Sequence, residues 1–167
     1  MKQEFEVIKK PRLMLLSIIE PLTTEQLNHI PTGFNNNLIW NMAHLVSGQQ
    51  GICYTRAGVP VIVDDKYYTP YRPNTKPQGF VNADDIAEVK ELLISTIDKL
   101  EEDYHAGILN NYQAMTTRYG VTLSTIEDAI RFLPFHEGLH FGYIWALKRV
   151  VLEKGDEIKL KNSGAAL

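Results

Sequence analysis

Hydrophobic side chains recur with helical spacing in four long segments of the chain. In residues 3–20, 82–104 and 124–155, apolar positions return every three or four residues, as on the buried face of an amphipathic helix. Residues 35–57 begin with three asparagines, favoured helix N-caps, and continue as a more apolar segment. Gly48 in this segment suggests close approach of another helix. The pattern predicts four long helices.

Glycine, proline and capping residues set the expected boundaries of these helices. Pro11 predicts a break or kink in the first helix, unless that helix begins at Pro11. Thr23 opens a capping-box sequence that predicts a short extra helix. Gly155 is the expected stop of the last helix, and residues 154–167 are expected to form a frayed tail.

The connections between the predicted helices differ greatly in length. Residues 58–81 are too long for an ordinary structureless loop, and loops of this length are often functional. They also predict a crossover that lets the second and third helices run parallel. Residues 105–123 leave room for a short extended piece. We therefore expect an all-α fold, a four-helix bundle with a long crossover between helices 2 and 3, as a single domain over residues 1–167.

Composition and charge narrow the class of protein. The chain has 167 residues, and its 17 basic and 20 acidic residues give a net charge of −3. The basic residues are scattered, which argues against nucleic-acid binding. No apolar run approaches the length of a membrane span, and the N-terminus lacks the apolar stretch of a signal peptide. Cys53 is the single cysteine, which favours a reducing, cytoplasmic location.

Three histidines are the strongest candidates for chemistry. His136 and His140 stand four residues apart on one predicted helix, so both imidazoles can reach one metal ion. The alternative is two partly buried histidines, each hydrogen-bonded to a carbonyl or carboxylate. His44 lies in the most apolar part of the second long helix, and a facing helix could bring it to the same ion. Three neutral ligands would leave positions open for water or substrate.

Residues 136–140 also match the H-E-x-x-H pattern, in which the glutamate is the general base of a zinc protease. A third histidine six residues after His140 would extend the pattern, but that position is Ala146. Glu137 could therefore act as a base, orient an imidazole, pair with a basic residue or lie at an interface.

The remaining candidates are weaker. His29 lies at a predicted helix end, His105 follows an acidic run, and Cys53 is best interpreted as a small buried thiol. The long loop carries side chains that could contact a ligand or another subunit, or pack on each other: Tyr67, Tyr68, Tyr71 and Arg72.

Two motifs, NLIWNMAHL at residues 37–45 and FHEGLHFGYI at residues 135–144, together with the helix arrangement, resemble the DinB/YfiT-like superfamily. Carried over by position, the family's metal ligands fall on His44, His136 and His140. The resemblance implies a divalent metal ion, zinc or nickel, and frequently a homodimer. It also implies a low-molecular-weight thiol as a co-substrate. Tyr143 stands where relatives often carry glutamine, which weakens the transfer of substrate contacts but not of the ligands.

These observations leave three functional hypotheses. The first is a metal-dependent enzyme that activates a thiol or water for transfer to a small electrophilic substrate, as in thiol S-transferases. The second is a metal-dependent hydrolase with Glu137 as the base. The third is a metal-binding, dimeric module without catalysis.

Overall fold

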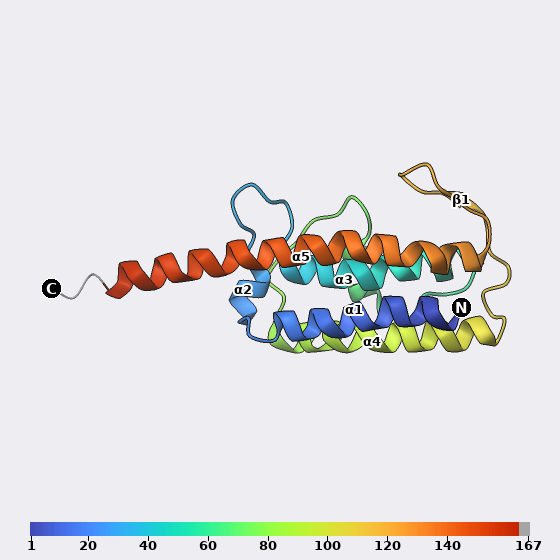
Figure 1. Ribbon diagram of the computed structural model, residues 1–167, viewed down its shortest axis with the longest axis horizontal. Coiled ribbons are helices and arrows are strands. Elements are labelled where there is room, and N and C mark those ends of the chain that lie inside the picture. The colour runs from blue at the N-terminus through green and yellow to red at the C-terminus, as the bar shows by residue number, and fades with distance from the viewer. Residues whose placement is uncertain (164–167) are drawn as a thin grey trace.

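The computed structural model describes residues 1–163, with side chains described through Glu153. It is an all-α bundle, as the periodicity predicted (Figure 1). The four long helices are α1 (Lys2–Ile19), α3 (Leu38–Gln49), α4 (Ala83–His105) and α5 (Ile126–Ser163). The short elements are α2 (Thr24–Asn28), η1 (Gln50–Thr55), η2 (Asp65–Tyr67), η3 (Thr69–Tyr71), and the antiparallel strands β1 (Met115–Thr116) and β2 (Thr122–Leu123).

Asparagine caps begin the two middle helices where the sequence placed them. The Asn37 side chain accepts a hydrogen bond from the backbone N–H of Trp40 at the start of α3. Asn82 accepts one from Asp85 at the start of α4. The capping box at Thr23 is also present and begins α2. The predicted extended piece is confirmed as the β1–β2 hairpin.

Three predicted boundaries differ from the structure. Pro11 neither ends nor begins a helix, since α1 continues through it from Lys2. Gly155 does not stop α5, which continues to Ser163; a glycine inside a helix costs only about 1 kcal/mol relative to alanine. The helix expected over residues 35–57 is not one continuous α-helix, because α3 ends at Gln49 and the π-helix η1 begins at Gln50. Of the predicted frayed tail, residues 164–167 lie outside the described part of the chain.

The bundle places α1 and α3 on opposite sides, each packed against both α4 and α5. The register shows that α3 and α4 run parallel. The Arg12 guanidinium bonds to the carbonyls of Leu45 and Leu93, and one turn further along both helices Gln49 bonds to the carbonyl of Thr96. The long segment between α3 and α4 is therefore the predicted crossover (Figure 1).

The buried core consists of two apolar clusters separated by a polar layer. Along α1, Ile8 belongs to one cluster and Leu15 to the other, and the buried Arg12 lies between them. The same division occurs along α4 and α5, whereas on the α3 side the second cluster begins at Cys53 in η1. The buried polar residues of this layer are Arg12, Gln49, Thr96 and Glu137. Within residues 1–163, no helix is long and apolar enough to span a lipid bilayer.

Candidate metal centre

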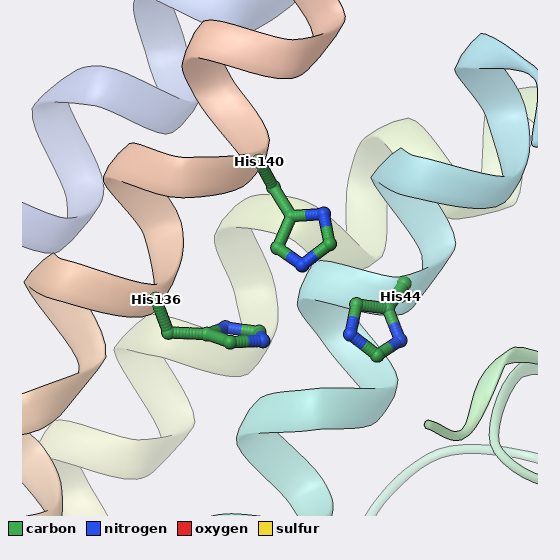
Figure 2. A group of neighbouring side chains, drawn as sticks. All are labelled: His44, His136 and His140. Atoms are coloured by element: carbon green, nitrogen blue, oxygen red, sulfur yellow. The ribbon is translucent and has the colours of Figure 1, made fainter. Parts of the chain in front are cut away.

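Helices α3 and α5 bring His44, His136 and His140 together in one cluster. One nitrogen of each imidazole turns toward the space between the three rings (Figure 2). Potential ligand nitrogens of the three residues lie within 4.8 Å of one another. The ring centroids are separated by 5.3 Å for His44 and His136, 4.6 Å for His44 and His140, and 4.8 Å for His136 and His140. The facing-helix arrangement inferred from spacing is present.

A backbone carbonyl of the long crossover sets the tautomer of His44. Its Nδ1 lies 2.6 Å from the carbonyl oxygen of Tyr71, which can only accept a hydrogen bond. Nδ1 therefore carries the proton, and Nε2 keeps a free lone pair. The indole of Trp40 stacks on the imidazole, with centroids 4.8 Å apart and an interplanar angle of 9°. The hydrogen bond and the stacking together orient this ring.

A side-chain amide sets the tautomer of His140 in the same way. The Nδ2 group of Asn41 donates to the carbonyl of Asn37 at 2.8 Å, which turns its Oδ1 toward His140. That oxygen lies 3.1 Å from His140 Nδ1 and accepts its proton. The Nε2 lone pair of His140 is therefore also free. An acceptor behind a coordinating imidazole is the usual companion of a metal ligand.

His136 is oriented by packing instead of by a hydrogen bond. Its Nδ1 is buried and has no hydrogen-bond partner among the residues that the structure describes. The ring lies against Gly48 of α3, where a Cβ atom would be 2.8 Å from Cε1 and 3.4 Å from Nε2. The close approach predicted at Gly48 is therefore made by the His136 imidazole of α5, which lies directly against the backbone of α3.

Burial keeps the three imidazoles neutral at physiological pH. It lowers the pKa of His136 to about 3, with smaller contributions from the other two histidines and from Arg12. It lowers the pKa of His140 to about 4, again with His44 as a secondary cause. The pKa of His44 is also lowered by burial, although its bond to Tyr71 opposes the shift. Neutral imidazole is the form that binds metal ions.

The residues present suit a divalent metal ion. Two nitrogens bound to one tetrahedral ion at 2.0–2.1 Å are about 3.3 Å apart, so only a small inward movement of the rings is needed. Two of the three tautomers are already set for coordination through Nε2. His44 is only 6% exposed, whereas His136 and His140 are partly exposed, so solvent reaches the cluster. Three imidazoles accept several metals, and the cluster does not select among them.

Glu137 does not face the histidine cluster as a free base. Its carboxylate is buried and held by Arg12, whose Nε lies 3.0 Å from Oε2 and whose Nη2 lies 2.5 Å from Oε1. Of the roles left open by the sequence, pairing with a basic residue is the one present. The carboxylate of an H-E-x-x-H base must reach a water at the metal, and this two-point pairing holds it in the core instead.

The other sequence candidates lie outside the cluster. His29 and His105 are both exposed, and His105 lies beside Glu101, at 4.0 Å, and the Tyr104 ring. Cys53 is a free, fully buried thiol, and burial raises its pKa to about 12. It is therefore the small buried thiol that the sequence favoured, and not a nucleophile.

The long crossover builds a cavity beside the cluster. Residues 66–81 and the start of α3 enclose about 320 Å³. Trp40 and Tyr71 line this cavity and also contact His44, one by stacking and the other through its carbonyl. Thr75 ties the loop to Trp40 by accepting a 3.3 Å hydrogen bond from the indole N–H. The crossover therefore has a role at the site, which is to orient His44.

Sequence reasoning missed the residues that hold the ligands. Asn41 stands three residues before His44 and carries no separate signal. The carbonyl of Tyr71 has no signal in the residue type, because any residue provides one. Arg12 did have a signal: it follows Phe5 and Ile8 and precedes Leu15 at the 3–4 spacing of the apolar stripe on α1. A charged residue at a core position indicates a buried partner.

Fold and cluster together define a helical bundle with a candidate three-histidine metal centre between two of its long helices. The chain belongs to the DinB superfamily, whose family profile matches residues 9–144 and thus includes all three histidines. This confirms the resemblance found in the two motifs. No match was found among functionally curated proteins.

Proposed function

We propose that this protein holds a divalent metal ion, zinc or nickel, with His44, His136 and His140, and uses it as an enzyme. The proposed reaction is the transfer of a thiol or water to a small electrophilic substrate, with a low-molecular-weight thiol as the favoured co-substrate. The observation that carries this proposal is the convergence of the three imidazoles, whose ligand nitrogens lie within 4.8 Å. Membership in the DinB superfamily supports it.

A divalent ion with open coordination positions supplies Lewis-acid chemistry, and it favours the anionic form of a thiol or water at neutral pH. The chain contributes orientation and protonation state. Tyr71 and Asn41 keep the protons of His44 and His140 on Nδ1, away from the centre. Burial keeps all three imidazoles uncharged, so none of them repels a cation placed between the rings.

The geometry favours this proposal over the two alternatives. A hydrolase with Glu137 as base would require the carboxylate to leave the buried Arg12, which would leave a charge unpaired. A non-catalytic module would be favoured by a site closed to solvent, whereas His136 and His140 are partly exposed.

Two measurements test the proposal, first of metal content and then of turnover. Elemental analysis of purified protein should find one divalent ion per site in the wild type and in His105→Ala, whose histidine is exposed and outside the cluster. His44→Ala should lose most of that metal. Full metal content in His44→Ala would reject the three-ligand site.

The metal-loaded protein is then incubated with an activated aryl halide, with and without glutathione. We expect a thioether product, in which a carbon–sulfur bond replaces the carbon–halogen bond and halide and the thiol proton are released. Its formation should require both the thiol and His44. Turnover that does not depend on thiol would reject the transferase in favour of hydrolysis. Metal binding without any turnover across electrophiles and thiols would favour the non-catalytic module.

We further propose the homodimer, with α5 as its interface. Phe135, Leu139 and Tyr143 are spaced four apart on α5 and are 49%, 44% and 37% exposed. Such a row of exposed apolar side chains is typical of an association surface. Light scattering after size exclusion should give a dimer for wild type and for Ile108→Glu, a control at an exposed apolar residue elsewhere. Leu139→Glu should give a monomer, and a dimer in this variant would reject α5 as the interface.

A further inference from the structure

One buried arginine connects all four long helices of the bundle. Arg12 of α1 is 1% exposed. Its Nε and Nη2 donate to the Glu137 carboxylate of α5 at 3.0 and 2.5 Å. Nη2 also donates to the carbonyl of Leu45 in α3 at 3.1 Å. Nη1 donates to the carbonyl of Leu93 in α4 at 2.8 Å and approaches Thr96 Oγ1 at 3.4 Å.

The partners of Arg12 on α3 and α5 are the immediate neighbours of proposed metal ligands. Leu45 follows His44, and Glu137 follows His136. A guanidinium presents its five N–H groups in a rigid planar fork, so bonds to two helices fix how those helices lie against each other. The Arg12 bonds therefore set the relative position of α3 and α5 at the level of the histidine cluster.

We infer that Arg12 is a positioning residue, which holds His44 and His136 at the spacing that metal binding requires without touching the metal ion. This inference rests on the proposed metal site. Together with Glu137, Arg12 forms the centre of the polar layer that separates the two apolar clusters of the core.

Fold stability alone gives little reason for such a pair. Replacing a buried ion pair by apolar side chains of similar size is often neutral or stabilising, because the charges no longer have to be desolvated. A bundle that needed only a packed interior could continue both apolar clusters through this layer. The presence of this buried ion pair beside two ligands is explained if its role is to position those ligands.

The double variant Arg12→Met/Glu137→Met separates positioning from stability. Both charges are removed together, so no unpaired charge is left in the core, and we expect unfolding at an unchanged or higher urea concentration. Co²⁺ serves as the probe, titrated into metal-free protein and followed by its visible absorption. We expect affinity for Co²⁺ to fall about tenfold, the lower end of the cost of removing a group bonded directly to a ligand, because Arg12 acts through the residues next to the ligands. Unchanged Co²⁺ affinity in the stable double variant would overturn the inference.

Two further variants make the result specific. Tyr54→Phe removes a buried 2.8 Å hydrogen bond to Asp103 in the other part of the core. It should lower stability but bind Co²⁺ like wild type; equally weak binding would show that general destabilisation explains the loss, and would also overturn the inference. Arg12→Lys keeps the positive charge beside Glu137, but one ammonium cannot span the same carbonyls. It should also bind Co²⁺ more weakly, and its affinity decides the matter if the double variant fails to fold.

The metal-free protein gives a measurement that does not depend on metal binding. Nuclear Overhauser contacts between the ring protons of His44 and His136 should be present in the wild type and lost or weakened in Arg12→Met/Glu137→Met. If the wild type binds no Co²⁺, the proposed function fails while these contacts still test Arg12. If the contacts persist unchanged in the variant, Arg12 does not position the two rings.

Discussion

Replacing Gly48 by alanine should weaken metal binding while leaving the fold intact. Gly48 lies on α3 under the imidazole of His136, and its lack of a side chain allows the ring to lie there. A Cβ at this position would be 2.8 Å from His136 Cε1. Carbon atoms in favourable contact are about 3.5–4.0 Å apart, so the ring must move by roughly 0.7–1.2 Å.

The expected loss of metal affinity follows from comparing the movement of the His136 ring with the precision that metal coordination requires. Metal–nitrogen distances are held to about ±0.2 Å, several times less than the movement that the methyl group imposes. We expect Co²⁺ affinity to fall at least about tenfold, or about 1.4 kcal/mol. The free energy of unfolding should change by less than about 1 kcal/mol. The imidazole is the free end of a side chain that can rotate away, and alanine is favoured over glycine within a helix by about 1 kcal/mol.

The matched control is Gly138→Ala. Gly138 lies between His136 and His140 on α5, and a Cβ atom there would meet nothing within 4 Å. This variant makes the same chemical change on the ligand-bearing helix without touching a ligand. Co²⁺ titration and urea unfolding should be measured on both variants and on wild type. Equal Co²⁺ affinity in Gly48→Ala and Gly138→Ala would refute the reasoning.

Three other predictions test the surroundings of the histidines. Asn41→Ala removes the acceptor behind His140 Nδ1, and isothermal titration should show Zn²⁺ binding about 10- to 100-fold weaker; unchanged affinity would mean that this bond does not set the tautomer. The pKa values of His136 and His140 lie near 3 and 4 in the folded protein and near 6.5 in the unfolded chain, which therefore binds more protons between these values. Metal-free protein should thus lose stability as pH falls from 6.5 toward 4, by up to about 1.4 kcal/mol per pH unit for each histidine. In His136→Gln/His140→Gln, the free energy of unfolding measured in urea should depend less steeply on pH. A slope equal to that of the wild type would show that these two histidines do not cause the pH dependence. Cys53 should resist iodoacetamide at pH 8 in the folded protein and react in urea, because it is fully buried and its pKa is raised to about 12; mass spectrometry showing rapid labelling of the native chain would contradict its burial.

The three-histidine cluster depends on a supporting set of residues drawn from the whole chain. Tyr71 comes from the crossover, Asn41 and Gly48 from α3, and Arg12 from α1. Each acts on a different feature of the cluster: two tautomers, the room for one ring, and the proposed spacing of the helices. Ligand geometry in this bundle is therefore a property of several elements and not of the two motifs alone.

The sequence by itself determined the features that depend on local periodicity and on residue type. The 3–4 spacing of apolar positions predicted four long helices, and the capping asparagines placed the starts of α3 and α4. The four-residue separation of His136 and His140 placed both on one helix face. The apolar surroundings of His44 indicated the inner face of a second helix. The boundaries predicted at Pro11 and Gly155 were wrong because packing and neighbouring helix formers outweigh the local penalty, about 3 kcal/mol for proline and about 1 kcal/mol for glycine.

Only the tertiary structure decided where Glu137 points and what holds the rings. Glu137 occupies the position of a catalytic base in a short motif, but its partner Arg12 is 125 residues away in the chain. Tyr71 orients His44 through a backbone carbonyl, a group that every residue carries and that no side-chain pattern can distinguish. Both contacts arise from the way distant helices and the crossover pack, because a hydrogen bond depends on positions in space and not on separation along the chain.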